Sequence, residues 1–280
     1  MQVILLCAGL SKRMQPLSDK MLFEFCEKEL ILHQIQWLYD SGYKDIIIVA
    51  NQNNLFDLKK ICSKQNQVDC KFAIQKDLDD GMKGAIEACI PHVKNEALIV
   101  NSNDIVEKQL FSDIMERSQR SDDDAIICGK VVEKYFPGGY LSIDKNSYLS
   151  NIIEKPGEGN EPSDLVNIVV HYFRDFHNFV ERIRGQKNTQ DDAYELGLKQ
   201  LSKDKKIYVL PYKGSWQAIK YPWHILDANN LFLSSVHSSI HPQANIAKSA
   251  TIKGNVFIEK GVKVFENAVI SGPCYIGENT

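Results

Sequence analysis

The sequence has little of several features that mark particular classes of protein. No uninterrupted apolar run approaches the ~20 residues that a membrane-spanning helix needs, and no basic segment precedes the first apolar run. We therefore expect no membrane partner and no secretory signal. With 33 basic and 36 acidic residues, the net charge of −3 gives no electrostatic reason to expect nucleic acid as a partner.

Cysteine and histidine are too scattered to suggest a metal cluster or a disulfide framework. None of the seven cysteines forms a Cys-x-x-Cys pair, and their number is odd. Four histidines lack ligand spacing and are expected in the core or on the surface: His33, His92, His171 and His177. Reduced thiols are typical of cytoplasmic enzymes, so we predict a cytoplasmic location. A chain of 280 residues, 44% of them hydrophobic, is long enough for two globular domains.

The first strand-like run leads into a loop that suits a polyphosphate. Val3–Leu6 is apolar, and Gly9 lies in the turn that follows it. Small residues let the backbone approach a ligand, and loop N–H groups can face phosphate oxygens. Arg13 and Lys20 would neutralise the negative charge of the phosphates. Taken alone, these residues also describe an ordinary first strand and turn with a solvated basic loop.

As a whole, residues 3–22 resemble the signature loop of the nucleotidyltransferases that make sugar nucleotides. That signature reads L-A-A-G-x-G-x-R-M/L and then, after a gap, P-K. Four residues fall on its fixed positions: Ala8, Gly9, Arg13 and Lys20. Three residues depart from it: Cys7, Ser11 and Asp19. The resemblance implies that the nucleotide is bound by a run of four loop residues, namely Ala8, Gly9, Leu10 and Ser11. It also implies that Arg13 and Lys20 act in catalysis.

Strand-like and helix-like segments alternate along the first two hundred residues. Apolar strands are predicted at residues 3–6, 45–50, 71–74 and 97–100, with helices at residues 30–41, 55–63 and 82–89. This alternation is typical of an α/β fold with a Rossmann-like, doubly wound sheet, whose ligands bind beyond the carboxyl ends of the strands. Later strand-like segments predict an added mixed sheet over the first: residues 126–132, 139–143, 149–154 and 166–173. Further helices are predicted at residues 176–183, 191–201 and 223–233, and a last strand at residues 206–211.

From Ile240 onward the sequence repeats every six residues. Seven aliphatic residues share this register: Ile240, Ile246, Ile252, Ile258, Val264, Ile270 and Ile276. Small or β-branched residues follow the first six of them at the fourth position. This repeat predicts a three-sided parallel β-helix with the aliphatic side chains in its bore. It resembles the left-handed β-helix of hexapeptide acyltransferases.

Two domains follow from this change of period. We predict a nucleotidyltransferase domain over residues 1–235 and a partial hexapeptide-repeat β-helix over residues 236–280. The sequence stops part-way through a repeat without a polar cap, so we expect it to be a piece of a longer chain. Hexapeptide helices of the resembled acyltransferases associate as trimers, which implies a homo-oligomer here.

A carboxylate and a glutamine are the candidates for the metal and the nucleobase. Asp104 follows the strand-like run at residues 97–100, and a carboxylate at a strand end suits Mg²⁺ together with phosphate oxygens. Asp104 could instead cap a following helix; the resemblance implies that it binds the metal. Gln75 and Gly81 match a family pattern whose residues touch the nucleobase, with one extra residue in the turn between them.

The family's sugar-binding elements occur in the same order as in the resembled enzymes. The resemblance implies that Gly139 leaves room for the sugar ring and that Glu154 and Asn167 bind sugar groups. It implies that Lys155, in an E-K-P tripeptide, holds the sugar phosphate and takes part in catalysis. The tripeptide could also be part of an exposed hairpin turn.

The match breaks in the segment from Trp216 to Asn229, which resembles W-x-D-I-G-x-P-x-D-L-L-x-A-N. Ala218 stands in place of the aspartate that is the second metal ligand in the family, and Lys220 in place of the glycine. Either Asp104 and phosphates alone hold the metal, or Lys220 supplies a fixed positive charge to the substrate, or activity is lost. We count Lys220 among the substrate-binding residues.

The resemblance implies transfer of a nucleotidyl group, with a pyrimidine favoured, from an NTP to a sugar 1-phosphate. The products would be an NDP-sugar and pyrophosphate, and Mg²⁺ the cofactor. Such chemistry depends on positioning and charge neutralisation, so it needs no protein nucleophile. Three alternatives remain. One is a cytidylyltransferase acting on a phosphorylated alcohol or other non-sugar phosphate, and another is a non-catalytic nucleotide-sugar-binding paralogue. The third is an acyltransferase role, which would belong to further coils of the repeat.

Overall fold

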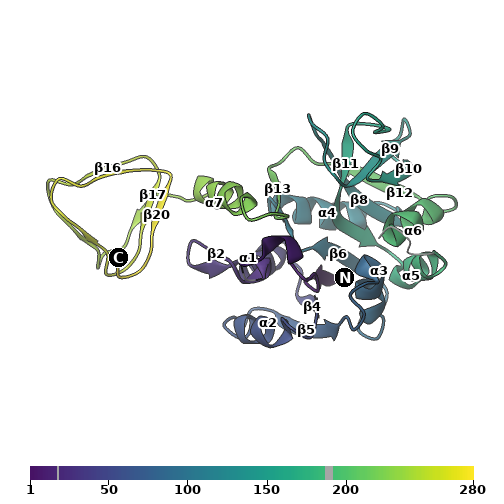
Figure 1. Cartoon of the computed structure of the whole chain (residues 1–280), viewed down its shortest axis with the longest axis horizontal. Coiled ribbons are helices and arrows are strands. Elements are labelled where there is room, and N and C mark those ends of the chain that lie inside the picture. The colour runs from purple at the N-terminus through teal and green to yellow at the C-terminus, as the bar shows by residue number, and fades with distance from the viewer. Residues whose placement is uncertain (18, 187–191) are drawn as a thin grey trace.

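The computed structural model describes residues 1–17, 19–186 and 192–280. Its centre is one nine-stranded sheet that holds strands from both the early and the later part of the chain (Figure 1). Seven strands run in the order β10-β9-β11-β6-β1-β4-β5, while β8 pairs with β11 and β12 pairs with β8. The strands of this sheet are β1 (Gln2–Leu6), β4 (Asp45–Ala50), β5 (Asp69–Ile74), β6 (Ala97–Asn101), β8 (Ala125–Val131), β9 (Gly139–Ile143), β10 (Leu149–Glu154), β11 (Leu165–Phe173) and β12 (Ile207–Pro211).

The continuous apolar strands lie in the middle of the sheet, as their sequences predict. β1 pairs in parallel with β4 on one side and with β6 on the other. All five residues of β1 are buried, and so are the last five residues of β4. A parallel strand covered by helices on both faces has no solvent side, which is why these runs do not alternate with polar residues.

The later strands do not form a second sheet over the first, so that prediction is wrong. β11 pairs antiparallel with β6 through Val170–Phe173 and with β8 on its other edge, which extends the sheet in one layer. β9 and β10 lie beside the N-terminal half of β11, where Val166 is opposite Tyr140. All nine residues of β11 are buried because it occupies a central position in one continuous sheet.

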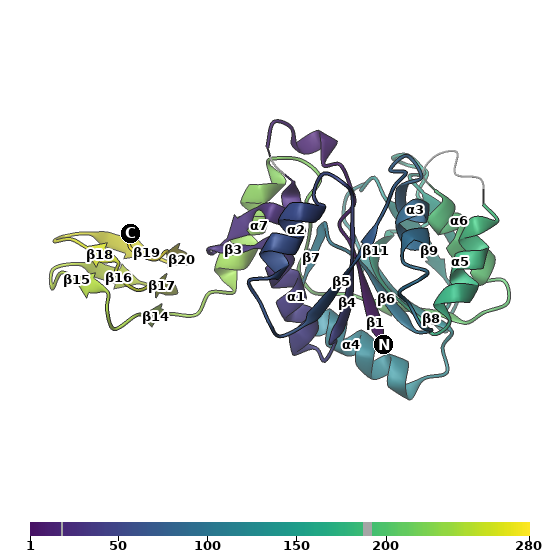
Figure 2. The same ribbon diagram turned by 90° about the horizontal axis from the view of Figure 1, so that it is seen from below.

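Helices cover both faces of the sheet (Figure 2). One face packs against α1 (Leu30–Asp40), α2 (Leu55–Cys62) and α4 (Gln109–Arg120). The other face packs against α3 (Gly81–Ala88), α5 (Phe176–Arg184) and α6 (Ala193–Leu201). The doubly wound arrangement is thereby confirmed. The sequence did not predict α4, and the predicted start of α6 at Asp191 lies outside the described residues.

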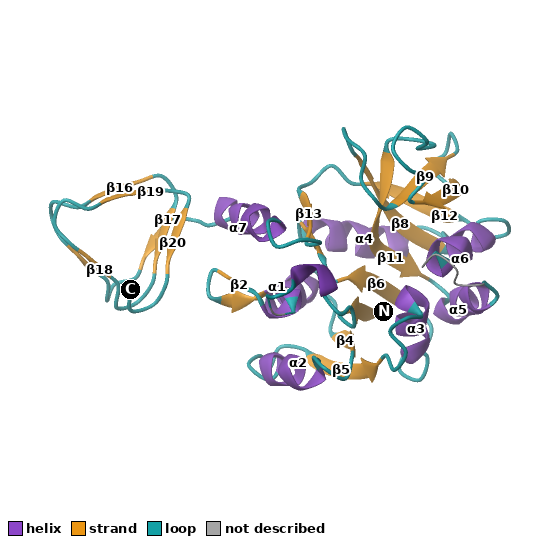
Figure 3. Cartoon of the chain, in the orientation of Figure 1, coloured by secondary structure: helices purple, strands orange, loops and turns teal. Residues whose placement is uncertain are grey.

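Shorter elements complete this part of the molecule (Figure 3). They are the 3-10 turns η1 (Lys12–Met14) and η2 (Lys20–Leu22), the hairpin strands β2 (Glu24–Phe25) and β3 (Lys28–Glu29), and the pair β7 (Asp104–Val106) and β13 (Trp216–Ala218). All seven cysteines are free. Within the described ranges, no helix has the length and apolar character to cross a bilayer.

After α7 (His224–Ser234) the chain forms three small stacks of short parallel strands, which outline a triangle in Figure 1. One stack contains β14 (Ser239–Ile240), β17 (Val256–Ile258) and β20 (Cys274–Ile276). The others pair β15 (Asn245–Ile246) with β18 (Lys263–Val264), and β16 (Thr251–Lys253) with β19 (Val269–Ser271). Ile240 lies opposite Ile258, and Ile258 opposite Ile276, so three hexapeptides separate stacked partners.

The β2–β3 hairpin contacts these C-terminal strands. The Tyr275 hydroxyl lies 3.2 Å from Glu27 Oε2 and 2.9 Å from Glu259 Oε1, and the Glu278 N–H donates to Glu27. A Cβ atom on Gly277 would lie 1.9 Å from Glu27 Oε1, so a larger residue there would displace the end of the Glu27 side chain. The hairpin and the C-terminal segment are therefore in direct contact.

Candidate active site

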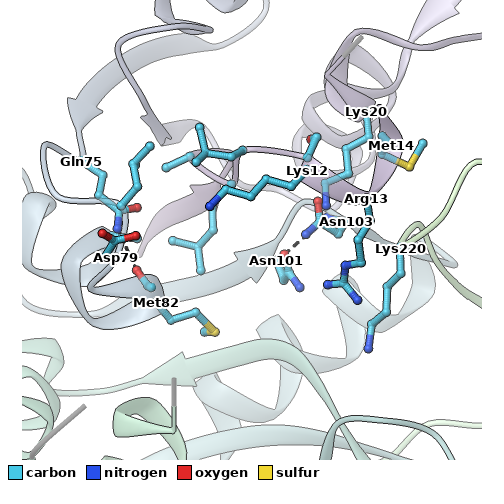
Figure 4. Close-up of a pocket in the computed structure, with 18 residues that line it drawn as sticks. Lys12, Arg13, Met14, Lys20, Gln75, Asp79, Met82, Asn101, Asn103 and Lys220 are labelled. Atoms are coloured by element: carbon cyan, nitrogen blue, oxygen red, sulfur yellow. Dashed lines mark hydrogen bonds between the residues drawn. The ribbon is translucent and has the colours of Figure 1, made fainter. Parts of the chain in front are cut away.

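A pocket of about 450 Å³ opens where β1, β5 and β6 end (Figure 4). Nine of the predicted residues line it: Ala8, Gly9, Leu10, Ser11, Arg13, Lys20, Gln75, Gly81 and Lys220. Further residues that the sequence did not single out also line it, among them Lys12, Asp79, Met82, Asn101 and Asn103. Asn101 is the last residue of β6 and Asn103 lies two residues beyond it, and this place at a strand end was the available signal for them. The pocket lies beyond the carboxyl ends of parallel strands, where ligands of such sheets bind.

Two asparagines that the sequence analysis missed hold the predicted phosphate loop. They come from the segment after β4, where Asn51 Nδ2 donates to the Ala8 carbonyl at 2.8 Å. Asn54 Nδ2 donates to the Cys7 carbonyl at 2.8 Å and to Asp19 Oδ2 at 2.7 Å. Both asparagines are buried. The loop is thus fixed by side chains before any ligand arrives.

Ser11 adopts a left-handed backbone conformation, with φ of 50° and ψ of 29°. The resembled signature has a glycine at this position, and glycine takes positive φ at no steric cost. A serine in this left-handed conformation carries some backbone strain.

We predict that Ser11→Val lowers the free energy of unfolding by about 1 kcal/mol or more, since a β-branched residue with positive φ is strongly disfavoured. Ser11→Gly should keep the stability and activity of the parent. Ser121→Val, at a backbone φ of −113°, is the matched control. Thermal and denaturant unfolding measure the difference. Equal stability of the two valine variants would contradict the role assigned to the backbone of Ser11.

Lys20 begins η2, and Asp19 caps that turn. Asp19 Oδ1 accepts a hydrogen bond from the Met21 N–H at 3.1 Å. The aspartate that stands in place of the signature's proline therefore caps this turn. Burial lowers the pKa of Lys20 to about 8, while the negative charges of Asp19 and Asp104 oppose that shift. Arg13 lies with its guanidinium carbon 5.3 Å from the ring centroid of Tyr221. In Figure 4, Arg13 and Lys220 extend in the same direction beside each other.

Asp104 does not line the pocket, although its chain neighbours Asn101 and Asn103 do, and it is only 7% exposed. Its Oδ1 accepts from the Trp216 indole N–H at 3.0 Å, and its Oδ2 accepts from Asn101 Nδ2 at 3.0 Å. Burial raises the pKa of this carboxyl, and the Trp216 hydrogen bond and the charges of Lys220 and Lys20 oppose the shift. Within the described ranges, no group of three or more His, Cys, Asp or Glu residues could hold a metal ion.

The position of Ala218 is informative for the metal site. β13 pairs antiparallel with β7, and this register sets Ala218 directly opposite Asp104. Residues directly opposite each other have neighbouring Cβ atoms on the same face. A carboxylate at position 218 would therefore stand next to Asp104. Because residue 218 is alanine, this chain supplies Asp104 alone. A methyl group stands at the position where a second carboxylate would fit.

Gln75 is 5% exposed and uses its amide nitrogen within the protein. Nε2 donates to the Asp77 carbonyl at 2.9 Å and to the Gly81 carbonyl at 2.8 Å, which closes the turn before α3. Two backbone carbonyls can bind only the amide NH₂ group, so these bonds fix the orientation of the side chain. A ligand in the pocket therefore meets the Gln75 carbonyl oxygen, which accepts hydrogen bonds.

The predicted sugar-binding residues form a row across three strands. Glu154 of β10 lies opposite Gly139 of β9. Asn167 of β11 lies one position from Val166, which pairs with Tyr140, so it is next to Gly139 on the same face. A Cβ atom on Gly139 would lie 3.2 Å from Glu154 Oε2 and 3.4 Å from Asn167 Cβ. Gly139 thus leaves a notch between a carboxylate and an amide.

Two lysines lie between this notch and the pocket. Lys155 Nζ pairs with Glu154 Oε1 at 2.8 Å. Lys220 Nζ donates to the Pro137 carbonyl at 2.9 Å and lies 3.8 Å from the ring centroid of Phe136. Burial lowers the pKa of Lys220. The charge of Asp104 opposes this shift and that of Arg13 reinforces it. Glu154 and Lys155 have smaller effects, which raise and lower the pKa respectively. Lys220 is therefore within electrostatic reach of both regions.

Comparison with known proteins gives this arrangement a context. A family model described as nucleotidyl transferase matches residues 2–234. The chain is 29% identical over 276 residues to a bifunctional sugar-1-phosphate nucleotidylyltransferase/acetyltransferase of Sulfurisphaera tokodaii, covering 94% of this chain and 63% of that protein. It is 29% identical over 278 residues to the bifunctional protein GlmU of Methanococcus vannielii, covering 94% and 62%. The chain thus spans less than two thirds of the length of these relatives.

Among solved structures, UDP-glucose pyrophosphorylase complexed with UDP-glucose is similar to this chain. The TM-score is 0.73 and the sequence identity 17%, over 83% of this chain and 98% of the other. Similarity at this level of identity concerns the fold. The fold is the mixed α/β fold of these proteins, with a central sheet in which parallel strands dominate.

Proposed function

The chain belongs to the nucleotidyl transferase family, and on that premise we propose that it transfers an NMP group from an NTP to a sugar 1-phosphate. The observation that carries the proposal is the pocket itself. It brings Arg13, Lys20 and Lys220 together beyond the strand ends, beside a backbone loop that buried asparagines hold. A cationic pocket with loop N–H groups suits a triphosphate.

In the proposed reaction, a phosphate oxygen of the sugar 1-phosphate attacks the α-phosphorus in line, and pyrophosphate leaves. Arg13 stabilises the leaving pyrophosphate. Lys20 neutralises charge at the α-phosphate and Lys155 at the incoming phosphate. Lys220, held by the Pro137 carbonyl, supplies a further fixed charge between the two substrates. Nucleotidyl transfer of this kind needs no proton transfer from the protein, because it depends on positioning and electrostatic stabilisation.

Sugar nucleotidyltransferases generally use a divalent metal ion. The residues of this chain fit Mg²⁺ as a single-carboxylate site, because Mg²⁺ binds through one or two carboxylates plus phosphates and water. Asp104 would hold it: each carboxylate oxygen accepts one hydrogen bond from a neutral donor and keeps further acceptor capacity. The ion would supply charge neutralisation on the phosphates.

The nucleobase would contact Gln75 and the start of α3 at Gly81. Only the Gln75 carbonyl oxygen is left for a ligand, so a base that presents an N–H group suits this position. Purines and pyrimidines both offer such a donor, so this contact does not choose between them. The pyrimidine NTP is favoured on the family resemblance alone.

Pyrophosphate release across a grid of NTPs and phosphorylated acceptors tests the proposal. The acceptors should include hexose 1-phosphates, N-acetylhexosamine 1-phosphates and phosphorylated alcohols. Release with a sugar 1-phosphate supports the proposal. Release with CTP and a phosphorylated alcohol alone would favour the cytidylyltransferase, to which Ala218 points as an atypical metal site. Nucleotide-sugar binding without release under any condition would favour a non-catalytic paralogue.

We also propose that residues 236–280, which follow the nucleotidyltransferase domain of residues 1–235, form coils of a left-handed parallel β-helix. The three parallel stacks and their spacing of three hexapeptides support this. Buried Val256, Ile258, Val262 and Val264 form the core of these coils. On their surface, Phe265 is 70% exposed and Val269 68% exposed. Exposed apolar side chains this close together suit an interface between copies, and a trimer is the proposed state.

We predict that Phe265→Glu combined with Val269→Glu dissociates this oligomer, since buried unpaired carboxylates at an interface are costly. Lys263→Glu, an exposed change on the same coil, is the control and should leave the oligomer intact. Light scattering on the full chain measures the mass. A monomeric parent, or an oligomer unaffected by the double change, would place the contact elsewhere or remove it.

A further inference from the structure

An irregularity in β11 brings two of its polar side chains into contact. The register between β11 and β8 shifts between Ile168 and Tyr172. Residues four apart in a regular strand are too far from each other for a hydrogen bond. Here His171 Nε2 lies 2.9 Å from Asn167 Oδ1. Bulges of this kind redirect side chains and are frequent near functional sites.

The second nitrogen of His171 is also occupied. Nδ1 lies 2.8 Å from the hydroxyl of Tyr194, which comes from α6 on the face of the sheet that also carries α3. His171 is fully buried and Tyr194 is 1% exposed. Burial lowers the pKa of His171 to about 3, and a hydrogen bond with the Ile168 backbone opposes the shift. The ring is therefore neutral and carries one N–H group.

The side-chain partners of the two nitrogens indicate which of them carries that proton. The Tyr194 hydroxyl makes no other hydrogen bond within the described part of the chain, and a buried O–H group without an acceptor is costly. It therefore donates to Nδ1, which leaves the proton of His171 on Nε2. This N–H donates to Asn167 Oδ1. The amide NH₂ of Asn167 consequently faces away from His171, and the Asn167 Cβ lies beside the Gly139 notch.

We propose that Tyr194 and His171 are positioning residues that fix the Asn167 amide with its NH₂ group toward the sugar. The inference rests on the proposed function and adds the chemistry of its sugar subsite. The notch then offers one acceptor, the Glu154 carboxylate, and one donor, the Asn167 NH₂. It fits a sugar with a hydroxyl that donates to Glu154 and a nearby oxygen, of a hydroxyl or an acylamino group, that accepts from Asn167.

The kinetic test removes one oxygen atom far from the substrate. Tyr194→Phe should raise KM for the sugar 1-phosphate about three- to tenfold, the loss expected for one ordered hydrogen bond, with kcat and KM for the NTP nearly unchanged. Tyr43→Phe is the matched control, because its buried hydroxyl donates to the Phe111 carbonyl at 3.1 Å outside the site. Unchanged KM in both variants, or the same rise in both, would overturn the proposal.

A double-mutant cycle separates positioning from general destabilisation. Tyr194→Phe should have no further effect on KM in an Asn167→Ala background, because its action passes through that amide. Asn167→Asp should raise KM while retaining the acceptor for His171. Additive effects of Tyr194→Phe and Asn167→Ala would contradict the proposal.

A readout without substrate keeps this inference distinct from the proposed function. Long-range ¹H–¹⁵N spectra of the full chain report which His171 nitrogen is protonated. We expect the Nε2–H form across neutral pH, and loss of that preference in Tyr194→Phe. Protonation at Nδ1 in the parent would overturn the positioning role of Tyr194 and His171 even if nucleotidyl transfer is observed. Protonation at Nε2 without any nucleotidyl transfer activity would support the positioning role of these two residues and refute the proposed function.

Discussion

Replacing Lys20 by alanine is expected to lower turnover at least about a hundredfold, the loss typical for one preorganised charge-stabilising donor. Arg13→Ala should have an effect of the same order. Both residues line the pocket, and Lys20 sits on a turn whose cap, Asp19, is itself held by Asn54. This preorganisation is why we expect a large effect on turnover rather than on substrate binding alone.

The pKa of Lys20 adds a pH dependence to this expectation. With its pKa lowered to about 8, Lys20 carries its charge below that pH and loses it above. The free enzyme's kcat/KM should therefore fall as pH rises through about 8. Lys20→Arg keeps a charge at all these pH values, so the fall should move to higher pH even if the rate is lower.

Lys60→Ala is the control for these variants. Lys60 is exposed on α2, outside the pocket, so removal of its charge should leave the pyrophosphate-release rate unchanged. Parental rates in both Lys20→Ala and Arg13→Ala would remove the two residues from the site. A Lys20→Arg profile that falls at the same pH as the parent would assign the titration to another group.

The sequence predicted the central strands and the turn after β1 well because both are local features. Val3–Leu6 and residues 46–50 are apolar runs that are buried on both faces, and the loop after β1 matches a signature at four fixed positions. The single sheet could not be predicted in the same way. Whether β11 pairs with β6 or starts a new layer depends on contacts about seventy residues apart in the sequence, which no local pattern encodes.

The site residues that the analysis missed have a similar explanation. Asn51 and Asn54 act on the loop from the segment after β4, and their partners are backbone carbonyls that a sequence does not display. His171 has no ligand spacing and was expected in the core or on the surface. It lies in the core, where a bulge turns it toward Asn167. Pairings between distant strands therefore determine which buried polar residues reach a site.

The Asp104→Asn variant is expected to lose most of its magnesium-dependent activity. The magnesium concentration for half-maximal rate should rise at least about tenfold, since even loss of a partner of a metal ligand costs that much. The fold should be retained, because an amide has the size of the carboxylate and its oxygen can still accept from the Trp216 indole N–H. Asp45→Asn, which removes a carboxylate paired with Lys71 at the other end of β4, is the control.

A second readout on the same variant separates a metal ligand from a mere counter-charge. The negative charge of Asp104 raises the pKa of Lys20, so its removal lowers that pKa further below the usual value of lysine. The alkaline fall of kcat/KM should therefore move to lower pH in Asp104→Asn. If this shift occurs while the magnesium titrations of variant and parent overlay, Asp104 acts only by holding the charge of Lys20 in place. In that case the proposed metal site is wrong, and the fixed charges of Lys20 and Lys220 are what neutralise the phosphates.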